Sequence, residues 1–345
     1  MIRIIKRFRF ALTALATAIA LTVGISTQAF AANLPGEGST WQPEIEANTA
    51  IRSHETLSEA HDTSGNIVQV WRGWDNNNIY LSINHGVARH WGDNNNPGGA
   101  TQTPGAATQT APRVIWTDYG FRIFHVGVDG HIYYAGITFG SGGGNPFLGS
   151  WVEVPNNAVT TPWTSVAVVA LPHGSWLLAW LGATNVNIYS TYFDGNTHSY
   201  SAPSQIPGAS SVDAPAMAYD PSWGQVIMVY RNTESSLVTM QRQNYGSSSW
   251  TAPQEPGFSG GGLVTYGSPS IALTNNGNGI ISARNQGGGY RSMTLSRSGT
   301  VAGWFDETTN FRPLTAAWAT AVGAVIYWLM TAQDGYVYWK VAGRF

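Results

Sequence analysis

The sequence contains no cysteine and few charged residues. Asp, Glu, Lys and Arg make up 10% of the 345 residues, and Lys occurs only at Lys6 and Lys340, whereas charged residues usually make up about a quarter of a globular chain. The absence of Cys excludes disulfides, so the fold must be stabilised by a large core. Beyond residue 9 the sequence has no basic run, which disfavours nucleic-acid binding through a basic patch and attraction to an anionic membrane surface.

The first 31 residues are typical of an export signal. Four cations in residues 3–9 precede an apolar stretch at residues 11–25, and Ala29-Phe30-Ala31 supplies the small residues that signal peptidase requires. The alternative, a retained membrane anchor, is disfavoured because the apolar stretch is short. We therefore expect cleavage after Ala31 and a secreted, extracellular or periplasmic protein without membrane insertion. Removing four cations from a formal net charge of −2 leaves a mature chain near −6.

Residues 214–253 contain four short apolar segments and no helical spacing. The segments cover residues 215–219, 226–230 and 237–241, and the fourth begins at Trp250. Turn-forming Gly, Pro, Asn, Asp and Ser residues separate them, which predicts four strands joined by hairpins. A single four-stranded sheet cannot bury both faces, so the unit is expected to repeat.

The unit repeats six times. An aromatic residue marks the fourth strand at intervals of 49 to 60 residues, at Trp41, Trp91, Trp151, Tyr200, Trp250 and Trp304. Pairs in the third strand, such as Ile79-Tyr80 and Ile132-Tyr133, repeat in the same register. Pairs that mark the first strand repeat as well, at Ala111-Pro112, Thr161-Pro162, Ala214-Pro215, Ser268-Pro269 and Thr315-Ala316. Four strands at this period predict an all-β, six-bladed β-propeller. An irregular β-sandwich is the alternative, but it does not explain how the two ends of the chain match.

The chain ends predict how the ring closes. The last copy, residues 315–345, supplies three strands, and residues 39–44 have the pattern of the missing fourth. We expect this N-terminal strand to complete the last blade, which leaves no open sheet edge. Residues 32–345 then form one domain. Two Gly-rich stretches, residues 94–105 and 140–149, are predicted to be loops.

Candidate ligand-binding residues lie in the turns between second and third strands. Arg72, Arg231 and Arg284 occupy the same position in three copies. An Arg fork binds a carboxylate or two sugar hydroxyls, and a neighbouring Trp offers an apolar face to a sugar ring. The predicted set is Arg72, Trp74, Asp75, Arg231, Glu234 and Arg284. The alternative for each Arg is that it ties its blade to the next through a backbone carbonyl.

No catalytic group is selected by the sequence. Acidic residues near the expected ligand face come from different copies, namely Glu55, Asp75, Asp129, Asp213, Glu234 and Asp334. Glycoside hydrolysis needs two carboxylates flanking one bond, and no pair stands out. Asp129 and Asp334 each precede Gly, which predicts turn residues. We expect no metal and no cofactor, because zinc spacing, a calcium loop and a P-loop are all absent.

The blade pattern resembles known propeller families. Residues 215–220 followed by 226–231 resemble repeats of sialidase-like and lectin-type bacterial propellers, and residues 123–133 are similar to secreted fucose-binding propeller lectins. Sialidases carry Ser-x-Asp-x-Gly-x-Thr-Trp turns, and residues 193–197 and 245–250 match these incompletely. The fucose lectins repeat an Arg and a Glu with a Trp in every blade, whereas this chain has the Arg in three copies.

Three functions are consistent with the sequence. The first is a secreted, lectin-like propeller that binds a glycan or glycoconjugate without cleaving it, through pockets at or between blades. The second is a sialidase-like glycoside hydrolase or lyase with its site at the mouth of the central channel. The third is a protein-binding scaffold. Aromatic content, low charge and the export signal favour the first.

Overall fold

The computed structural model describes most of residues 42–344. The gaps fall at residues 44, 47–48, 51, 85–96, 141–143, 157, 257–261, 297–304, 308–313, 316 and 323–324. The described residues form strands and turns and no helix, so none of these residues belongs to a helix able to cross a membrane. The expected signal peptide and three of the aligned aromatics, Trp41, Trp91 and Trp304, lie outside the described residues.

The strands pair into antiparallel sheets. The first sheet contains β4 (Ser58–His61), β5 (Ile67–Arg72), β6 (Asn78–Asn84) and β7 (Pro97–Ala107). The second contains β8 (Arg113–Thr117), β9 (Gly120–Val126), β10 (Ile132–Gly140), β11 (Gly144–Leu148) and β12 (Val152–Glu153). The third contains β13 (Ala167–Ala170), β14 (Trp176–Leu181), β15 (Asn187–Asp194), β16 (Ser199–Tyr200) and β17 (Ser204–Ser210).

Three further sheets complete the series. The fourth contains β18 (Ala216–Asp220), β19 (Gln225–Arg231) and β20 (Val238–Asn244). The fifth contains β21 (Ser270–Leu273), β22 (Gly279–Arg284), β23 (Tyr290–Leu295) and β24 (Phe305–Glu307). The sixth contains β25 (Trp318–Val322), β26 (Val325–Thr331), β27 (Val337–Arg344) and β1 (Gln42–Pro43). A separate hairpin joins β2 (Ile45–Glu46) and β3 (Thr49–Ala50).

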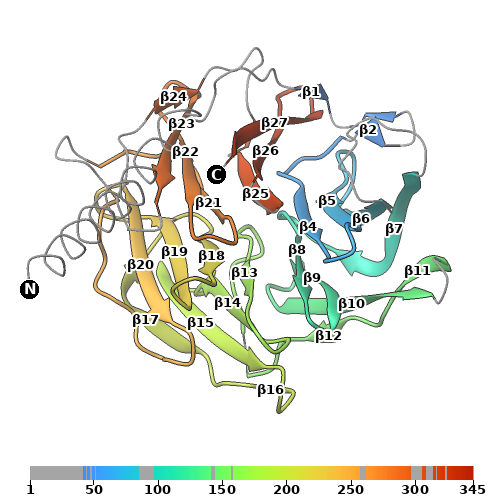
Figure 1. Ribbon diagram of the computed structural model, residues 1–345, viewed down its shortest axis with the longest axis horizontal. Coiled ribbons are helices and arrows are strands. Elements are labelled where there is room, and N and C mark those ends of the chain that lie inside the picture. The colour runs from blue at the N-terminus through green and yellow to red at the C-terminus, as the bar shows by residue number, and fades with distance from the viewer. Residues whose placement is uncertain are drawn as a thin grey trace, which may run out of the picture.

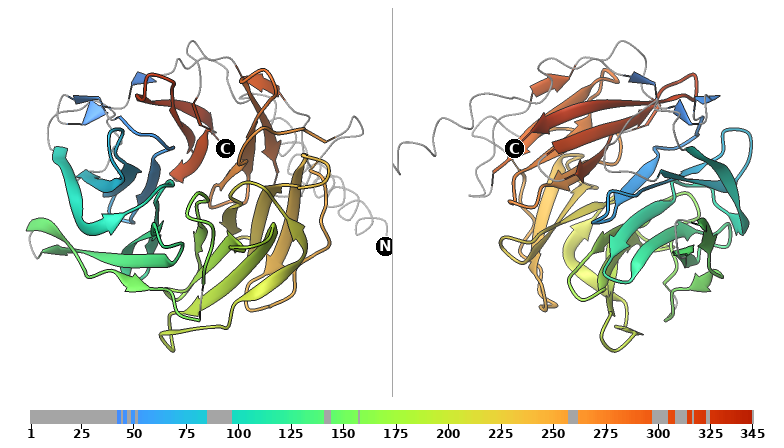
Figure 2. Two further views of the ribbon diagram at one scale, coloured as in Figure 1. Left: turned by 180° about the vertical axis from the view of Figure 1, so that it is seen from behind. Right: turned by 45° about the vertical axis from the view of Figure 1, so that its right-hand side comes forward.

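The sheets follow one another around a central axis (Figure 1). The first strand of each sheet contacts that of the next, from β4 to β8, β13, β18, β21 and β25, and β25 contacts β4. Figure 2 shows the same arrangement from behind and obliquely. The red sixth sheet therefore lies beside the blue first sheet, although they are at opposite ends of the chain.

The core lies between neighbouring sheets. Each adjacent pair encloses its own hydrophobic cluster, including the pair formed by the sixth and first sheets, where Leu57 and Trp71 meet Leu329 and Val337. All six side chains of β14 are buried, as expected for a strand covered on both faces. Apolar burial is the main favourable contribution to folding, and here it also holds each sheet against the next.

The first and sixth sheets are joined by hydrogen bonds as well. In β1, Gln42 and Pro43 pair with Trp339 and Tyr338 of β27, as predicted for a strand that completes the last sheet. Further along, the Ser53 amide donates to the Gly335 carbonyl over 2.9 Å. The two ends of the chain are thus paired in one sheet.

Strand numbers differ from the four predicted per copy. The second and third sheets have five strands, and the fourth has three. In the fourth, isolated bridges from Trp250 to Gln243 and from Gln254 to Met240 stand where the fourth strand was predicted.

The loop prediction for the Gly-rich stretches is wrong in the residues that the structure describes. Pro97–Ala107 forms β7, and Gly144–Leu148 forms β11. The register of β7 against β6 shifts twice. Glycine and proline are compatible with an outer strand whose ladder is interrupted in this way.

Candidate functional site

One end of the sheets is built from two kinds of connection. Turns between second and third strands lie beside the segments that enter the first strands, as shown by bridges from Ser53 to Gly73, Thr108 to Gly127 and Ser211 to Asn232. Side-chain hydroxyls reinforce these segments, since Ser53 and Ser211 donate to the carbonyls of Glu55 and Asp213 over 2.6 and 2.7 Å. This end carries the predicted ligand-binding residues, and we call it the turn face.

An Asp or Asn shapes most of these turns. Asp129 accepts hydrogen bonds from the His131 amide over 3.0 Å and from the Tyr133 hydroxyl over 2.7 Å. The Asp129 carboxylate raises the pKa of Tyr133 to about 12. The same arrangement links three further pairs, Asn76 with Tyr80, Asn185 with Tyr189, and Asp334 with Tyr338. The predicted turn role of Asp129 and Asp334 is confirmed.

Two of the aligned arginines tie neighbouring sheets together. Arg72 donates through Nη1 to the Gln109 carbonyl over 2.7 Å and through Nη2 to Asn77 Oδ1 over 2.8 Å. Arg284 donates to the Leu314 carbonyl over 3.4 Å. In both cases the acceptor lies in the segment entering the next sheet, which is the structural alternative raised for these residues.

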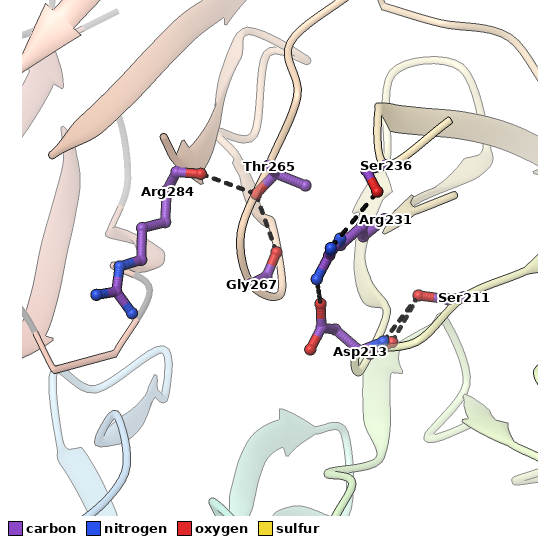
Figure 3. A network of polar contacts seen from close by, with 7 residues as sticks. All are labelled: Ser211, Asp213, Arg231, Ser236, Thr265, Gly267 and Arg284. Carbon is purple, nitrogen blue, oxygen red and sulfur yellow. Dashed lines mark hydrogen bonds and ion pairs between the residues drawn. The ribbon is translucent and has the colours of Figure 1, made fainter. Parts of the chain in front are cut away.

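The third aligned arginine is held by a carboxylate. Arg231 Nη1 lies 3.0 Å from Asp213 Oδ2, and its guanidinium lies 5.9 Å from the Tyr266 ring centre. Figure 3 shows this pair beside Arg284, whose side chain extends away from the Thr265 loop without meeting a carboxylate among the residues drawn. Arg231 therefore has its charge balanced locally.

The predicted sugar platform, Trp74, is partly covered. It stacks on His54 with ring centres 4.4 Å apart and planes inclined by 13°, and Arg52 lies 5.0 Å from its ring centre. Gly335 leaves room for it, because a Cβ there would lie 2.5 Å from the indole. Asp75 and Glu234 are exposed on turns. The structure does not bring these two residues into the cavity described next.

A cavity of about 410 Å³ opens where the six sheets converge on the turn face. Every sheet contributes to its wall, through Thr56, Ala111, Ser165, Pro215, Ser270 and Ala317. Glu55, Arg113, Arg284 and Trp318 line it as well. Among the predicted site residues, Arg284 lines this central cavity directly, while Trp74 packs on His54, which also lines it.

Arg113 is the residue that sequence reasoning missed. It begins β8 and is 6% exposed, and its guanidinium carbon lies 4.0 Å from the ring centre of Trp318. Its Nε and Nη1 atoms have no hydrogen-bond partner within the described part of the chain. The sequence did contain a signal for this residue. Arg113 is a cation directly after Ala111-Pro112, whereas small residues, Ala216 and Ser270, follow the equivalent Pro215 and Pro269.

The cavity carries more positive than negative groups. Burial raises the pKa of the Glu55 carboxyl, and Arg72 and Arg113 oppose the rise. Burial lowers the pKa of Arg113 to about 10, which Glu55 opposes, so Arg113 remains a cation at neutral pH. Glu55 is the one carboxylate found among the described lining residues, against Arg113 and Arg284.

Two exposed aromatic residues lie close in sequence to residues that line the cavity. Trp163 is 74% exposed and lies two residues before Ser165, and Tyr266 is 44% exposed and directly precedes Gly267. Ser165 and Gly267 both line the cavity. Trp163 and Tyr266, which we call the rim aromatics, present ring surface to solvent beside a polar cavity.

A second pocket, of about 360 Å³, lies between the third and fourth sheets. Tyr192 and Tyr245 line it together with Ser, Thr, Asn, Gln and aliphatic side chains, and none of its lining residues is charged. Tyr192 donates to Ser175 Oγ over 3.0 Å, and Tyr245 donates to the Pro172 carbonyl over 3.4 Å. This pocket contains none of the predicted binding residues.

No group of three or more His, Asp or Glu side chains in the described regions is placed to hold a metal ion. The described residues that line the central cavity offer charged forks, one carboxylate, hydroxyls and an aromatic ring. Such groups bind polar ligands by hydrogen bonding and stacking.

No protein-family model and no curated protein matches the sequence. The backbone is similar to solved structures with low sequence identity. A protein of unknown function from Dyadobacter fermentans matches with a TM-score of 0.61 and 14% identity, over 92% of this chain and 100% of that chain. The lectin of Aleuria aurantia, a six-bladed β-propeller that recognises fucose, matches with a TM-score of 0.57 and 11% identity, over 84% and 93%. The SapL1 lectin, solved with α-methyl fucoside, matches with a TM-score of 0.56 and 14% identity, over 85% and 97%. The chain thus has an all-β fold similar to that of six-bladed β-propeller lectins.

Proposed function

We propose that this chain is a carbohydrate-binding protein whose main site is the central cavity. The observation that carries the proposal is the combination of Arg113, Arg284 and Glu55 inside the cavity with the rim aromatics at its edge. Arginine forks and a carboxylate bind sugar hydroxyls, and exposed rings pack against the apolar faces of sugars. The similarity in fold to lectins that bind fucosides supports the same function.

The proposal includes the wider organisation expected from the sequence. The chain is exported, loses residues 1–31 and acts as a secreted single domain of residues 32–345. Six sheets surrounding one axis act as six blades, with β1 completing the last. Ligand binding without cleavage is the expected activity.

The proposal also redistributes roles among the predicted residues. Arg284 contacts the ligand, whereas Arg72 and Arg231 hold the segments that surround the cavity. Trp74 supports the cavity wall through His54. Asp75 and Glu234 remain available to the outer parts of a longer glycan, because both are exposed on the turn face.

Glycan-array binding with the mature protein tests the proposal. Alanine at Trp163 and Tyr266 should each weaken binding at least tenfold, equivalent to about 1.4 kcal/mol, because stacking surface is lost. Trp223→Ala is the matched control, since Trp223 is 58% exposed in the hairpin at the opposite end of the fourth sheet. Absence of binding to any glycan would reject the proposal and favour a protein-binding scaffold.

A glycoside hydrolase is the second candidate, favoured by Glu55. A half-buried carboxyl with a raised pKa has the property of a general acid. Turnover of a panel of chromogenic glycosides, lost in Glu55→Gln but retained in Glu234→Gln, would establish catalysis. Binding without turnover would establish the lectin.

A further inference from the structure

Arg113 is an unusual buried cation. Its side chain is fixed in place by the Trp318 ring, and it lines the central cavity instead of facing solvent. Two of its nitrogen atoms, Nε and Nη1, have no acceptor within the described residues. Buried donors in proteins are nearly always hydrogen-bonded, so the Arg113 guanidinium has donor capacity that the described residues do not use.

The charges around the cavity favour an anionic acceptor. Arg113 and Arg284 line the cavity with Glu55, which leaves one positive charge in excess, and Arg72 adds to the positive field at Glu55. Asp213 does not offset this excess, because it pairs with Arg231 over 3.0 Å. The whole chain has a formal net charge of −2, so the positive charge of the cavity is a local feature.

We infer that the central cavity binds a sugar that carries a carboxylate, with Arg113 and Arg284 as its partners. This inference rests on the proposed carbohydrate-binding function and specifies the ligand class. A carboxylate is planar and can accept two parallel hydrogen bonds from a guanidinium fork. The single negative charge of a carboxylate balances the one excess positive charge of the cavity. The negative charge of Glu55 repels ligands that carry more than one negative charge.

The position of Arg113 adds specificity. Arg113 is buried and its guanidinium carbon lies 4.0 Å from the Trp318 ring centre, so little side-chain freedom remains to be lost when a ligand binds. Lysine cannot replace this geometry, because an ammonium group is a point charge without a planar fork. A neutral sugar offers only hydroxyl acceptors, whose hydrogen bonds to a guanidinium are weaker than those of a charged carboxylate.

Calorimetric titration of the mature protein with matched sugar pairs tests the inference. Suitable pairs are methyl glucuronide with methyl glucoside, and methyl galacturonide with methyl galactoside. The acidic member should bind at least tenfold more tightly, and this preference should shrink as the NaCl concentration rises. Arg113→Lys should reduce the preference several-fold.

Two further variants keep the test independent of folding. Arg284→Gln changes a partly exposed side chain and should also reduce the preference for the acidic sugar. Arg242→Gln removes the same charge near the opposite end of β20 and should leave the preference unchanged. Melting temperatures of all three variants establish whether each is folded.

The outcomes separate the two proposals. Equal affinity for acidic and neutral sugars would overturn the carboxylate inference while the carbohydrate-binding function stands. Binding of sulfated sugars but not uronates would also overturn it. Failure to bind any sugar would overturn both.

Discussion

Arg231 and Arg113 carry the same guanidinium group in different surroundings. Arg231 has a carboxylate partner 3.0 Å away and is partly exposed. Arg113 is buried, packs on Trp318 and keeps two free donors beside a cavity. The sequence alignment singled out Arg231 because its position repeats. Arg113 does not repeat, and its surroundings depend on a residue 205 positions further along the chain.

A second single residue, His125, should make the free energy of unfolding depend on pH. Burial lowers the pKa of His125 from 6.5 to about 4, and its ring lies 4.6 Å from Trp151. As the pH falls from 6.5 towards 4, the unfolded chain binds a proton and the folded chain does not. The contribution of His125 to the free energy of unfolding is therefore complete above pH 6.5 and is lost as the pH falls towards 4. The loss is on the order of 3 kcal/mol.

Urea unfolding at pH 7.0 and pH 4.5 measures this contribution. His125→Gln should lose less stability between the two pH values than the parent protein, because glutamine does not titrate. His198→Gln is the control, since His198 is exposed on a hairpin of the third sheet. Equal losses in the parent and His125→Gln would contradict the assignment.

At the scale of elements, the turn between β9 and β10 depends on one carboxylate. Asp129→Ala removes the acceptor of both the His131 amide and the Tyr133 hydroxyl. We expect a loss of roughly 1 to 2 kcal/mol, because each of the two hydrogen bonds contributes about 1 kcal/mol net, measured by urea unfolding. Asp129→Asn should be nearly neutral, because Asn76 and Asn185 shape the equivalent turns. An alanine variant as stable as the asparagine variant would contradict this view.

The inner strands were the features that the sequence predicted best. The first strands of five sheets begin within six residues of the aligned pairs that predicted them, for example β18 after Ala214-Pro215. Hairpins bring together residues that are close in sequence, so local turn chemistry is sufficient to place them. The Gly-rich strands β7 and β11 were missed because their pairing comes from the edge of an existing sheet, which overrides weak local propensity.

At the scale of the whole molecule, β1 should contribute to stability out of proportion to its length. It covers the edge of β27 through Gln42 and Pro43. A mature protein lacking residues 32–43 should lose roughly 2 kcal/mol, at about 1 kcal/mol for each ladder hydrogen bond, and should associate through the exposed edge. Thermal unfolding and size-exclusion chromatography measure both effects.

A shorter truncation is the control for this prediction. Removal of residues 32–40 retains β1 and should leave both measurements unchanged. If the two truncations behave alike, pairing of β1 with β27 does not contribute to stability.

The sequence by itself determined the hairpins of the inner strands, their repetition along the chain and, through the incomplete last copy, the pairing of the two chain ends. These depend on hairpins and on the register of apolar residues, which recur locally in every copy. Only the tertiary structure decided where the candidate site lies. Arg113, Arg284 and Trp318 come from three sheets, and Glu55 comes from the segment that enters a fourth. They converge because each sheet packs its first strand against the next, and this convergence depends on contacts between residues far apart in the chain.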